Sequence, residues 1–217
     1  RECAGGRGAA SDPVEVLRRA VLDAHLQLRE GVVREPEWGG MATTLTAVLA
    51  RGDRFFLAHV GDSRAYLFRA GGLVRLTSDH TLVQSLMDDG TLTEDEAADF
   101  AFRSVLLRSV NAEAPAEADI HELHLRQGDR LLLCSDGLSD LVADDVINGA
   151  LALDDRDAVV EALIAAALEA GGRDNVTCLV ADVVDGPKIS QDGRVVGALE
   201  HPDLIVDPSA VRVPDLA

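Results

Sequence analysis

Three aspartates stand beside apolar runs of strand type, in positions where their carboxylates could hold a metal ion. They are Asp62, Asp136 and Asp174. Carboxylates gathered at a sheet edge repel one another unless a cation lies among them, and hard divalent ions such as Mg²⁺ or Mn²⁺ prefer oxygen ligands. Each aspartate also has an ordinary explanation, because Asp next to Gly or Asn is common in turns. Spacing alone does not establish that the three converge.

The first half of the chain is predicted to fold as one helix followed by several strands. Ser11 and Asp12 before Pro13 form a helix start, and apolar residues then recur at three- and four-residue spacing over residues 14–28. Alternating apolar residues divided by Gly-containing turn signals predict an antiparallel meander. Its strands are expected at residues 43–49, 54–60, 65–69 and 72–76.

The second half alternates groups of helices with groups of strands. Residues 81–98 have helical apolar spacing, with one helix ending near Gly90 and another capped at Thr93. Strands are expected at residues 104–110, 120–125, 130–134 and 176–184, and helices at 143–150 and 155–170. Helices and strands grouped in this way favour an α+β fold over an alternating parallel one.

Length and charge limit the classes of protein to consider. The 217 residues are 47% hydrophobic, which favours one domain over residues 1–185, and residues 186–217 are expected to be a tail or linker. A net charge of -18 without a cluster of Lys or Arg excludes nucleic acid as an expected partner. The acidity either keeps the protein soluble or is reversed locally by bound cations. No apolar run is long enough to predict a membrane span in this segment.

The cysteines indicate a reducing compartment. Cys3, Cys134 and Cys178 are an odd number without metal-type spacing, and the last two lie in apolar runs where a thiol behaves as a small hydrophobe. A cytoplasmic location is therefore expected. The histidines show no ligand pairing, so packing or surface roles are expected for them, and a capping or core role for His80.

Several stretches resemble, in order, the motifs of the type 2C (PPM) metal-dependent Ser/Thr protein phosphatase family. The run from Gly61 to Arg64, the run from Cys134 to Gly137 and the run from Gly172 to Thr177 are similar to successive motifs of that family. Residues 41–44 and 76–80 resemble two more, so the likeness extends over about residues 13–185. The bacterial members that oppose Ser/Thr kinases are the most similar branch.

The resemblance implies two antiparallel sheets packed as a sandwich flanked by helices, with a metal centre at one edge. Asp136 and Asp174 match ligands of two Mg²⁺ or Mn²⁺ ions, and Asp62 matches a residue that helps to hold a third. In that family a metal-bound water attacks the phosphorus of phosphoserine or phosphothreonine, so no catalytic side chain is assigned. The implied partners are phosphorylated proteins that Ser/Thr kinases modify.

Departures from the family pattern leave other functions open. The family's Asp-Gly-x-Gly-Gly motif is not found in residues 1–8, so the chain is expected to be N-terminally truncated, to lack the first strands and to bind metals poorly. A pseudophosphatase or regulatory binding module without turnover is one alternative. A phosphatase that acts on anti-sigma-factor antagonists is another. Residues 85–103, which lack the usual His-Pro before Arg103, are expected to differ in mobility or substrate choice.

Overall fold

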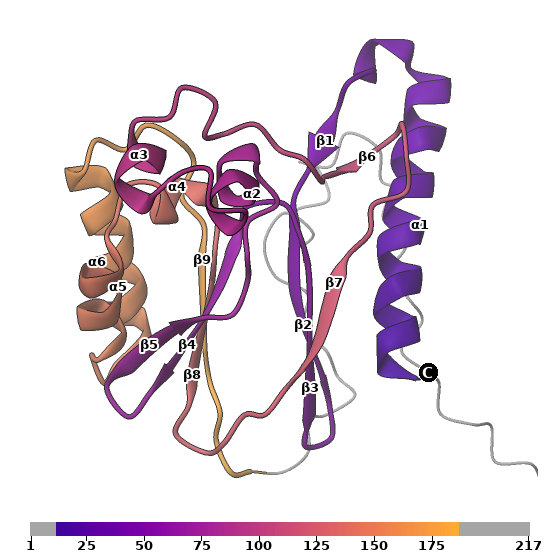
Figure 1. The fold of residues 1–217 in the computed structure, drawn as a ribbon. Coiled ribbons are helices and arrows are strands. Elements are labelled where there is room, and N and C mark those ends of the chain that lie inside the picture. Colours follow the sequence, from indigo (N-terminus) through magenta and orange to yellow (C-terminus); the bar gives the residue numbers. More distant parts are fainter. Residues whose placement is uncertain (1–11, 187–217) are drawn as a thin grey trace, which may run out of the picture. The chain divides into compact units, whose positions relative to one another are not determined.

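A computed structural model of the protein describes residues 12–186, almost all of which belong to the first of two units, Arg1–Val184 and Asp185–Ala217. Within these residues the helices and strands follow one another along the chain as Figure 1 shows. Their bounds are α1 Pro13–Arg34, η1 Pro36–Trp38, β1 Ala42–Thr43, β2 Leu45–Arg51, β3 Arg54–Val60, β4 Arg64–Arg69, β5 Gly72–Arg75, α2 Leu82–Asp88, α3 Glu94–Ala98, β6 Val110–Asn111, β7 Asp119–Leu123, β8 Arg130–Cys134, α4 Asp136–Ser139, α5 Asp144–Leu151, α6 Arg156–Glu169 and β9 Cys178–Asp182.

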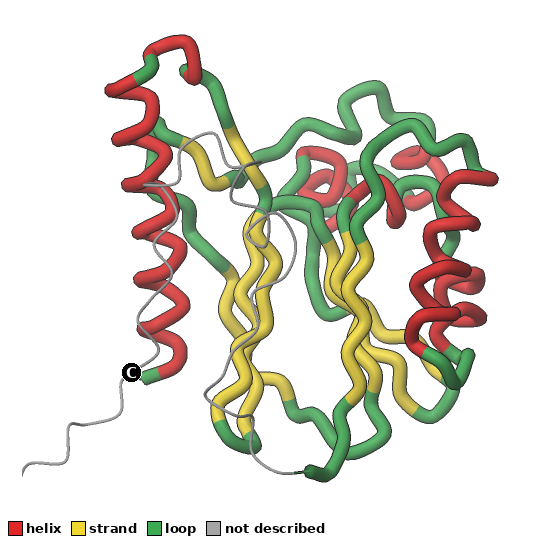
Figure 2. Tube along the Cα trace, turned by 180° about the vertical axis from the view of Figure 1, so that it is seen from behind, coloured by secondary structure: helices red, strands yellow, loops and turns green. Residues whose placement is uncertain are grey.

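The strands of the described residues form two larger antiparallel sheets and one small ribbon. The first sheet has the order β2-β3-β7, the second has the order β5-β4-β8-β9, and β1 pairs with β6. The two larger sheets lie between α1 on one side and α5 and α6 on the other (Figures 1 and 2). The α+β arrangement of antiparallel sheets flanked by helices that the sequence predicted is confirmed.

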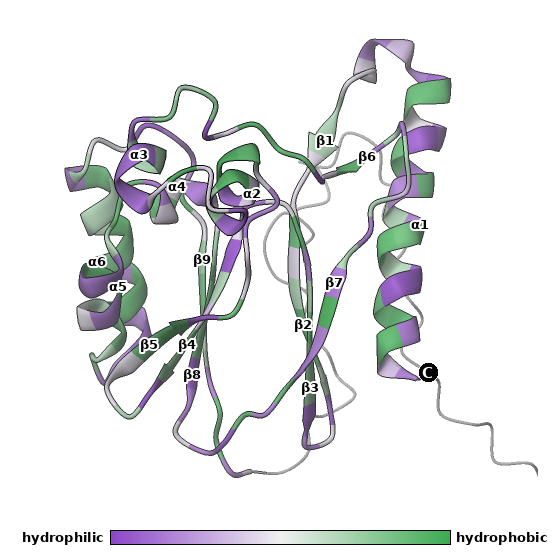
Figure 3. Cartoon of the chain, in the orientation of Figure 1, coloured by the Kyte–Doolittle hydropathy of each residue, from purple (hydrophilic) through white to green (hydrophobic). Residues whose placement is uncertain are grey.

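Helix α1 covers the first sheet with one apolar face. Its start is as predicted, because the side chain of Asp12 accepts a hydrogen bond from the Val14 amide and Pro13 occupies the first turn. Leu17 packs with Phe56 and Ala58 of β3, and Val21 packs with Val60 and Val110. Hydrophilic and hydrophobic residues alternate along the rest of the helix (Figure 3), where Leu22 and Val33 are exposed. No helix within residues 12–186 has both the length and the apolarity of a membrane span.

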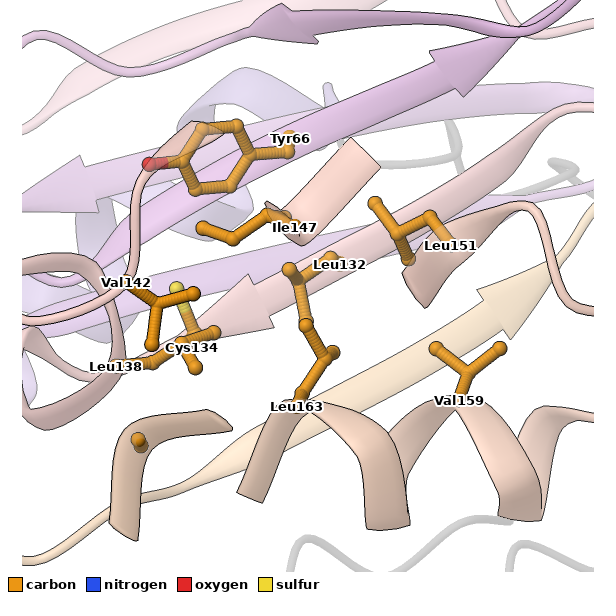
Figure 4. Close-up of a cluster of buried hydrophobic side chains, with 10 residues drawn as sticks. Tyr66, Leu132, Cys134, Leu138, Val142, Ile147, Leu151, Val159 and Leu163 are labelled. Atoms are coloured by element: carbon orange, nitrogen blue, oxygen red, sulfur yellow. The ribbon is translucent and has the colours of Figure 1, made fainter. Parts of the chain in front are cut away.

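The second sheet packs against α4, α5 and α6 around the largest apolar cluster of the described residues, part of which Figure 4 shows. The long apolar run of β8 faces the helices with its alternate residues, as expected for a buried strand. Cys134 is buried here as a free thiol whose pKa is raised to about 12, first by burial and then by the nearby Cys178. The buried members are Tyr66, Leu132, Cys134, Leu138, Val142, Ile147, Leu151, Val159, Leu163 and Ala167.

Two local predictions are wrong. The expected meander does not form, because β3 and β4 belong to different sheets and the chain crosses between them at residues 61–63. Residues 104–110 do not form the expected strand, and their only strand residue is Val110 at the start of β6. Leu82 donates to the Val105 carbonyl, and Leu107 donates to the His80 carbonyl. The segment therefore uses its backbone groups in a local contact with residues 80–82 and not in a long ladder.

The two short helices before that segment form as predicted. Thr81 caps α2 by accepting from the Gln84 amide, and α2 ends before Gly90. Thr93 and Glu96 form a capping box at the start of α3. The tail predicted for residues 186–217 lies almost wholly outside the described residues, so it stays a prediction, as does the cytoplasmic location.

Candidate metal centre

Asp62 lies in the turn that carries the chain from β3 in the first sheet to β4 in the second. Gly61, just before it, has a φ of 108°, a conformation that side chains rarely adopt, and a Cβ there would overlap the side chain of Thr44. The pKa of Asp62 is raised to about 6, first by burial and then by the charges of Asp136 and Asp79. The turn therefore holds a carboxylate close to other carboxylates in a partly dry site.

Asp136 lies where β8 ends and α4 begins. Its Oδ1 accepts a hydrogen bond of 2.9 Å from the Gly137 amide. The preceding residue ties this strand end to the loop before β9, because the Ser135 hydroxyl donates to the Asn175 carbonyl at 3.1 Å and accepts from the Thr177 amide at 3.0 Å. The Asp136 and Asp174 segments are thus adjacent loops at one end of the second sheet.

Asp174 is the most open of the three predicted residues. It is exposed, and its Oδ1 accepts from the Asn175 amide at 2.7 Å. A Cβ at Gly137 would overlap the Asn175 carbonyl oxygen, so the start of α4 and the loop after Asp174 are in close backbone contact. Only a residue without a side chain permits this approach.

The structure brings two of the predicted residues into direct electrostatic interaction and the third into the neighbouring loop. Asp62 and Asp136 repel each other, whereas Asp174 is linked to Asp136 through Ser135 and Asn175. Within residues 12–186, no group of three or more His, Cys, Asp or Glu side chains is already arranged to hold a metal ion. The donor set nevertheless fits a hard divalent cation, because a positive charge would relieve the repulsion that raises the pKa of Asp62.

A pocket of about 590 Å³ opens beside Asp62 and extends under α2 and α3. Its floor contains an ion-pair cluster in which Asp79 binds both Arg64, at 2.7 Å, and Arg75. Arg103 and Asp140 line the same pocket. Burial raises the pKa of Asp140, and the positive charge of Arg103 partly offsets this increase. The pocket therefore joins the Asp62 turn to the region at residues 85–103 that was expected to influence substrate choice.

Sequence reasoning missed the roles of Asp79 and Asp140. Both lie inside stretches that resemble family motifs, residues 76–80 and the run that continues from Gly137, but their spacing does not show that they face the Asp62 side of the site. Asp79 was detectable as a polar residue three positions after a predicted strand, 72–76. Its two arginine partners come from β4 and β5, and only the pairing of these strands brings them together.

Comparisons with known proteins agree with this geometry. A model of the family described as protein phosphatase 2C matches residues 7–178. The serine/threonine protein phosphatase PstP of Mycobacterium tuberculosis H37Rv is 44% identical over 174 residues, covering 80% of this chain but 34% of PstP. The serine/threonine phosphatase stp of Listeria monocytogenes serovar 1/2a is 31% identical over 182 residues, covering 82% of this chain and 69% of that protein. The chain thus spans about a third of the length of PstP.

Solved structures show the same fold. The crystal structure of the PstP catalytic domain in complex with two manganese ions superposes with a TM-score of 0.72 at 42% identity, covering 82% of this chain and 75% of that one. The PPM Ser-Thr phosphatase MsPP of Mycobacterium smegmatis, in complex with cacodylate, has a TM-score of 0.72 at 33% identity, covering 82% and 77%. The sandwich expected from the motifs is therefore the fold of these relatives.

Proposed function

Because the chain belongs to the protein phosphatase 2C family, we propose that it is part of an enzyme that hydrolyses phosphoserine and phosphothreonine in proteins, with Mg²⁺ or Mn²⁺ as its cofactor. The observation that carries the proposal is the electrostatic interaction between Asp62 and Asp136 at the ends of two different sheets. Two carboxylates held near each other in a partly buried place are an unfavourable arrangement unless a cation is bound. The manganese in the PstP structure supports the same cofactor here.

Asp136 and Asp174 are the proposed ligands of a two-metal centre, and Asp62 is the proposed ligand, with Asp136, of a third ion. When bound, such ions neutralise phosphoryl oxygens and lower the pKa of a coordinated water. The residues of the chain orient the donors: the Gly137 amide holds one oxygen of Asp136, and the Asn175 amide holds one oxygen of Asp174. Each carboxylate keeps its other oxygen for a ligand.

The pocket beside Asp62 is the proposed place for the substrate. Arg64 and Arg75 are both paired with Asp79, whereas Arg103 is exposed at the pocket wall. A guanidinium in that position attracts the dianion of a phosphorylated side chain, which an overall net charge of -18 would otherwise repel. The proposed substrates are phosphorylated proteins that Ser/Thr kinases modify.

The experiment is hydrolysis of a phosphothreonine peptide and of p-nitrophenyl phosphate with added Mn²⁺. It compares the 217-residue chain, the full-length product of its gene, and both carrying Asp136→Ala. Glu122→Gln is the matched control, because Glu122 is an acidic residue of β7 whose partner, Arg54, binds it on the protein surface. For the full-length product, we expect hydrolysis that requires Mn²⁺. It should persist in Glu122→Gln and fall to background in Asp136→Ala.

A different result would favour the alternative. If the full-length product binds Mn²⁺ and a phosphopeptide but hydrolyses neither substrate, the phosphatase proposal is wrong and the protein is a pseudophosphatase that acts by binding. If hydrolysis proceeds unchanged after Asp136→Ala, the enzyme assignment survives but Asp136 is not a ligand of the metal centre.

A further inference from the structure

The turn that carries Asp62 is held on its N-terminal side by a single residue, His80. The Gly61 amide donates to His80 Nδ1 at 3.1 Å, and the His80 amide donates back to the Gly61 carbonyl at 2.8 Å. Gly61 is buried, and His80 is 5% exposed. Both hydrogen-bonding groups of Gly61 are thus satisfied by one partner in a place that water does not reach.

The first of these bonds requires one particular tautomer of the imidazole. A backbone amide can only donate, so Nδ1 of His80 must be unprotonated and the ring proton must be on Nε2. Nε2 lies 3.0 Å from Oδ2 of Asp119, which accepts that proton's hydrogen bond. The second oxygen of Asp119 accepts from Arg108 at 2.8 Å. Asp119 on β7 therefore selects the form of His80 that can hold Gly61.

The C-terminal side of the same turn is held by two threonines at the start of the first sheet. The hydroxyls of Thr44 and Ser63 are 2.8 Å apart, and the Thr46 hydroxyl donates to the Ser63 carbonyl at 2.9 Å. A Cβ at Gly61 would overlap Thr44, so the turn lies close against that residue and leaves no room for a side chain at position 61. Asp62 is the residue between these two attachments.

We propose that His80 and Asp119 are a positioning pair that sets the place of the Asp62 carboxylate through Gly61. The pair rests on the proposed function, because it presupposes that Asp62 binds a divalent cation. Neither side chain touches the substrate or the metal; Asp119 orients the imidazole, the imidazole holds the Gly61 amide, and the amide fixes the turn. The His80 carbonyl also accepts a hydrogen bond of 2.7 Å from the Leu107 amide. The pair therefore connects the turn to the segment after residue 103.

Nuclear magnetic resonance of the ¹⁵N-labelled, metal-free protein tests the geometry without any activity. A scalar coupling between the Gly61 amide nitrogen and His80 Nδ1, together with a proton on Nε2 of His80, is expected. A proton on Nδ1, or no coupling between these two nitrogens, would overturn the proposal. The wild-type protein is sufficient for this measurement, so it does not depend on whether a variant folds.

Two variants separate positioning from packing. In His80→Asn the side-chain oxygen takes the place of Nδ1 and keeps an acceptor for Gly61, whereas in His80→Gln the amide nitrogen takes the place of Nε2 and the acceptor is lost. Both remove the same ring, so thermal unfolding should shift by a similar amount. Mn²⁺ affinity, measured by paramagnetic broadening of the Asp62 amide signal, is expected to fall roughly tenfold more in His80→Gln than in His80→Asn.

Equal loss of Mn²⁺ affinity in the two variants, or an Asp62 signal that Mn²⁺ does not broaden in the wild type, overturns the positioning role. Glu122→Gln, which removes an acidic partner from the same strand as Asp119, should leave the broadening unchanged. If the wild type binds Mn²⁺ at Asp62 but hydrolyses no phosphopeptide, the proposed function fails while the comparison of the two variants still decides the positioning role.

Discussion

The two halves of the sandwich hold their candidate ligands by different means. Asp136 follows β8 in the second sheet, between Cys134 and Leu138, which both belong to the largest apolar cluster. Asp62 follows β3 in the first sheet, where the apolar clusters under α1 are small and the turn is held by His80 and Thr46. One ligand is positioned by apolar packing of helices on a sheet, and the other by directed hydrogen bonds.

The two arrangements should differ in how well they tolerate substitutions. Apolar packing is not directional, so many weak contacts together position the end of β8. A turn with positive φ cannot rely on packing alone, because its backbone groups need partners in fixed directions. Truncation of buried side chains should therefore destabilise the second half. In the first half, loss of a hydrogen bond to the turn should displace the Asp62 carboxylate before the fold itself is lost.

The largest expected effect comes from a matched pair of leucines that face the two sheets. Leu163→Ala on α6 should lower the free energy of unfolding by about 4 kcal/mol, because Leu163 is fully buried among helices and strand. Leu17→Ala on α1 should cost about 2 kcal/mol, since Leu17 is 8% exposed and belongs to a smaller cluster. Urea unfolding measures both. Equal losses would show that the two cores contribute equally to stability, and that the second half does not depend more on apolar packing than the first.

A smaller loss of stability is expected at the contact between the Asp136 and Asp174 segments. Gly137→Ala places a methyl group on the Asn175 carbonyl, which should cost about 2 kcal/mol and weaken Mn²⁺ binding. Gly137 lies in α4, where alanine is otherwise preferred, so a loss must come from this overlap. Gly90→Ala is the control, because Gly90 has a φ of 77° and an added Cβ would meet open space. We expect it to lower the free energy of unfolding by about 1 kcal/mol and to leave metal binding unchanged.

The smallest effect concerns the charge of Asp62 in the metal-free protein. Its pKa is raised from 3.8 to about 6, so the folded state disfavours the charged form, and stability falls as the pH rises from about 4 to about 6. Asp62→Asn cannot ionise and should be more stable than the wild type by about 1 kcal/mol at pH 7, because partial solvent exposure screens the full effect of the shift. Thermal unfolding with a chelator, at pH 4 and pH 7, measures this difference.

Two controls sharpen that prediction. The gain from Asp62→Asn should vanish at pH 4, where the wild-type carboxyl is protonated, and it should reverse with Mn²⁺ if Asp62 is a ligand. A variant that is less stable than the wild type at pH 7 without metal would mean that hydrogen bonds to the carboxylate outweigh its repulsion by Asp136, and that the turn is better adapted to the charged form than its burial indicates.

Helices and paired strands with strong local signals were predictable. The cap at Asp12, the capping box at Thr93 and the alternation in β8 each depend on residues within a few positions of one another. The three aspartates were found for the same reason, since Asp62 and Asp136 follow local apolar runs and Asp174 precedes one. Residues 104–110 were assigned wrongly because their backbone partners, at residues 80–82, lie more than twenty positions away.

The sequence by itself determined most of the helices and strands, the aspartates beside apolar strands, and the family that the motifs resemble, because these properties depend on neighbouring residues. Only the tertiary structure decided that the chain leaves one sheet at Gly61 and enters the other at Arg64, and that His80, Asp119 and Thr46 surround that crossing. Such contacts depend on sheet pairing between distant segments, and no local pattern of residues specifies which distant partner a polar group will meet.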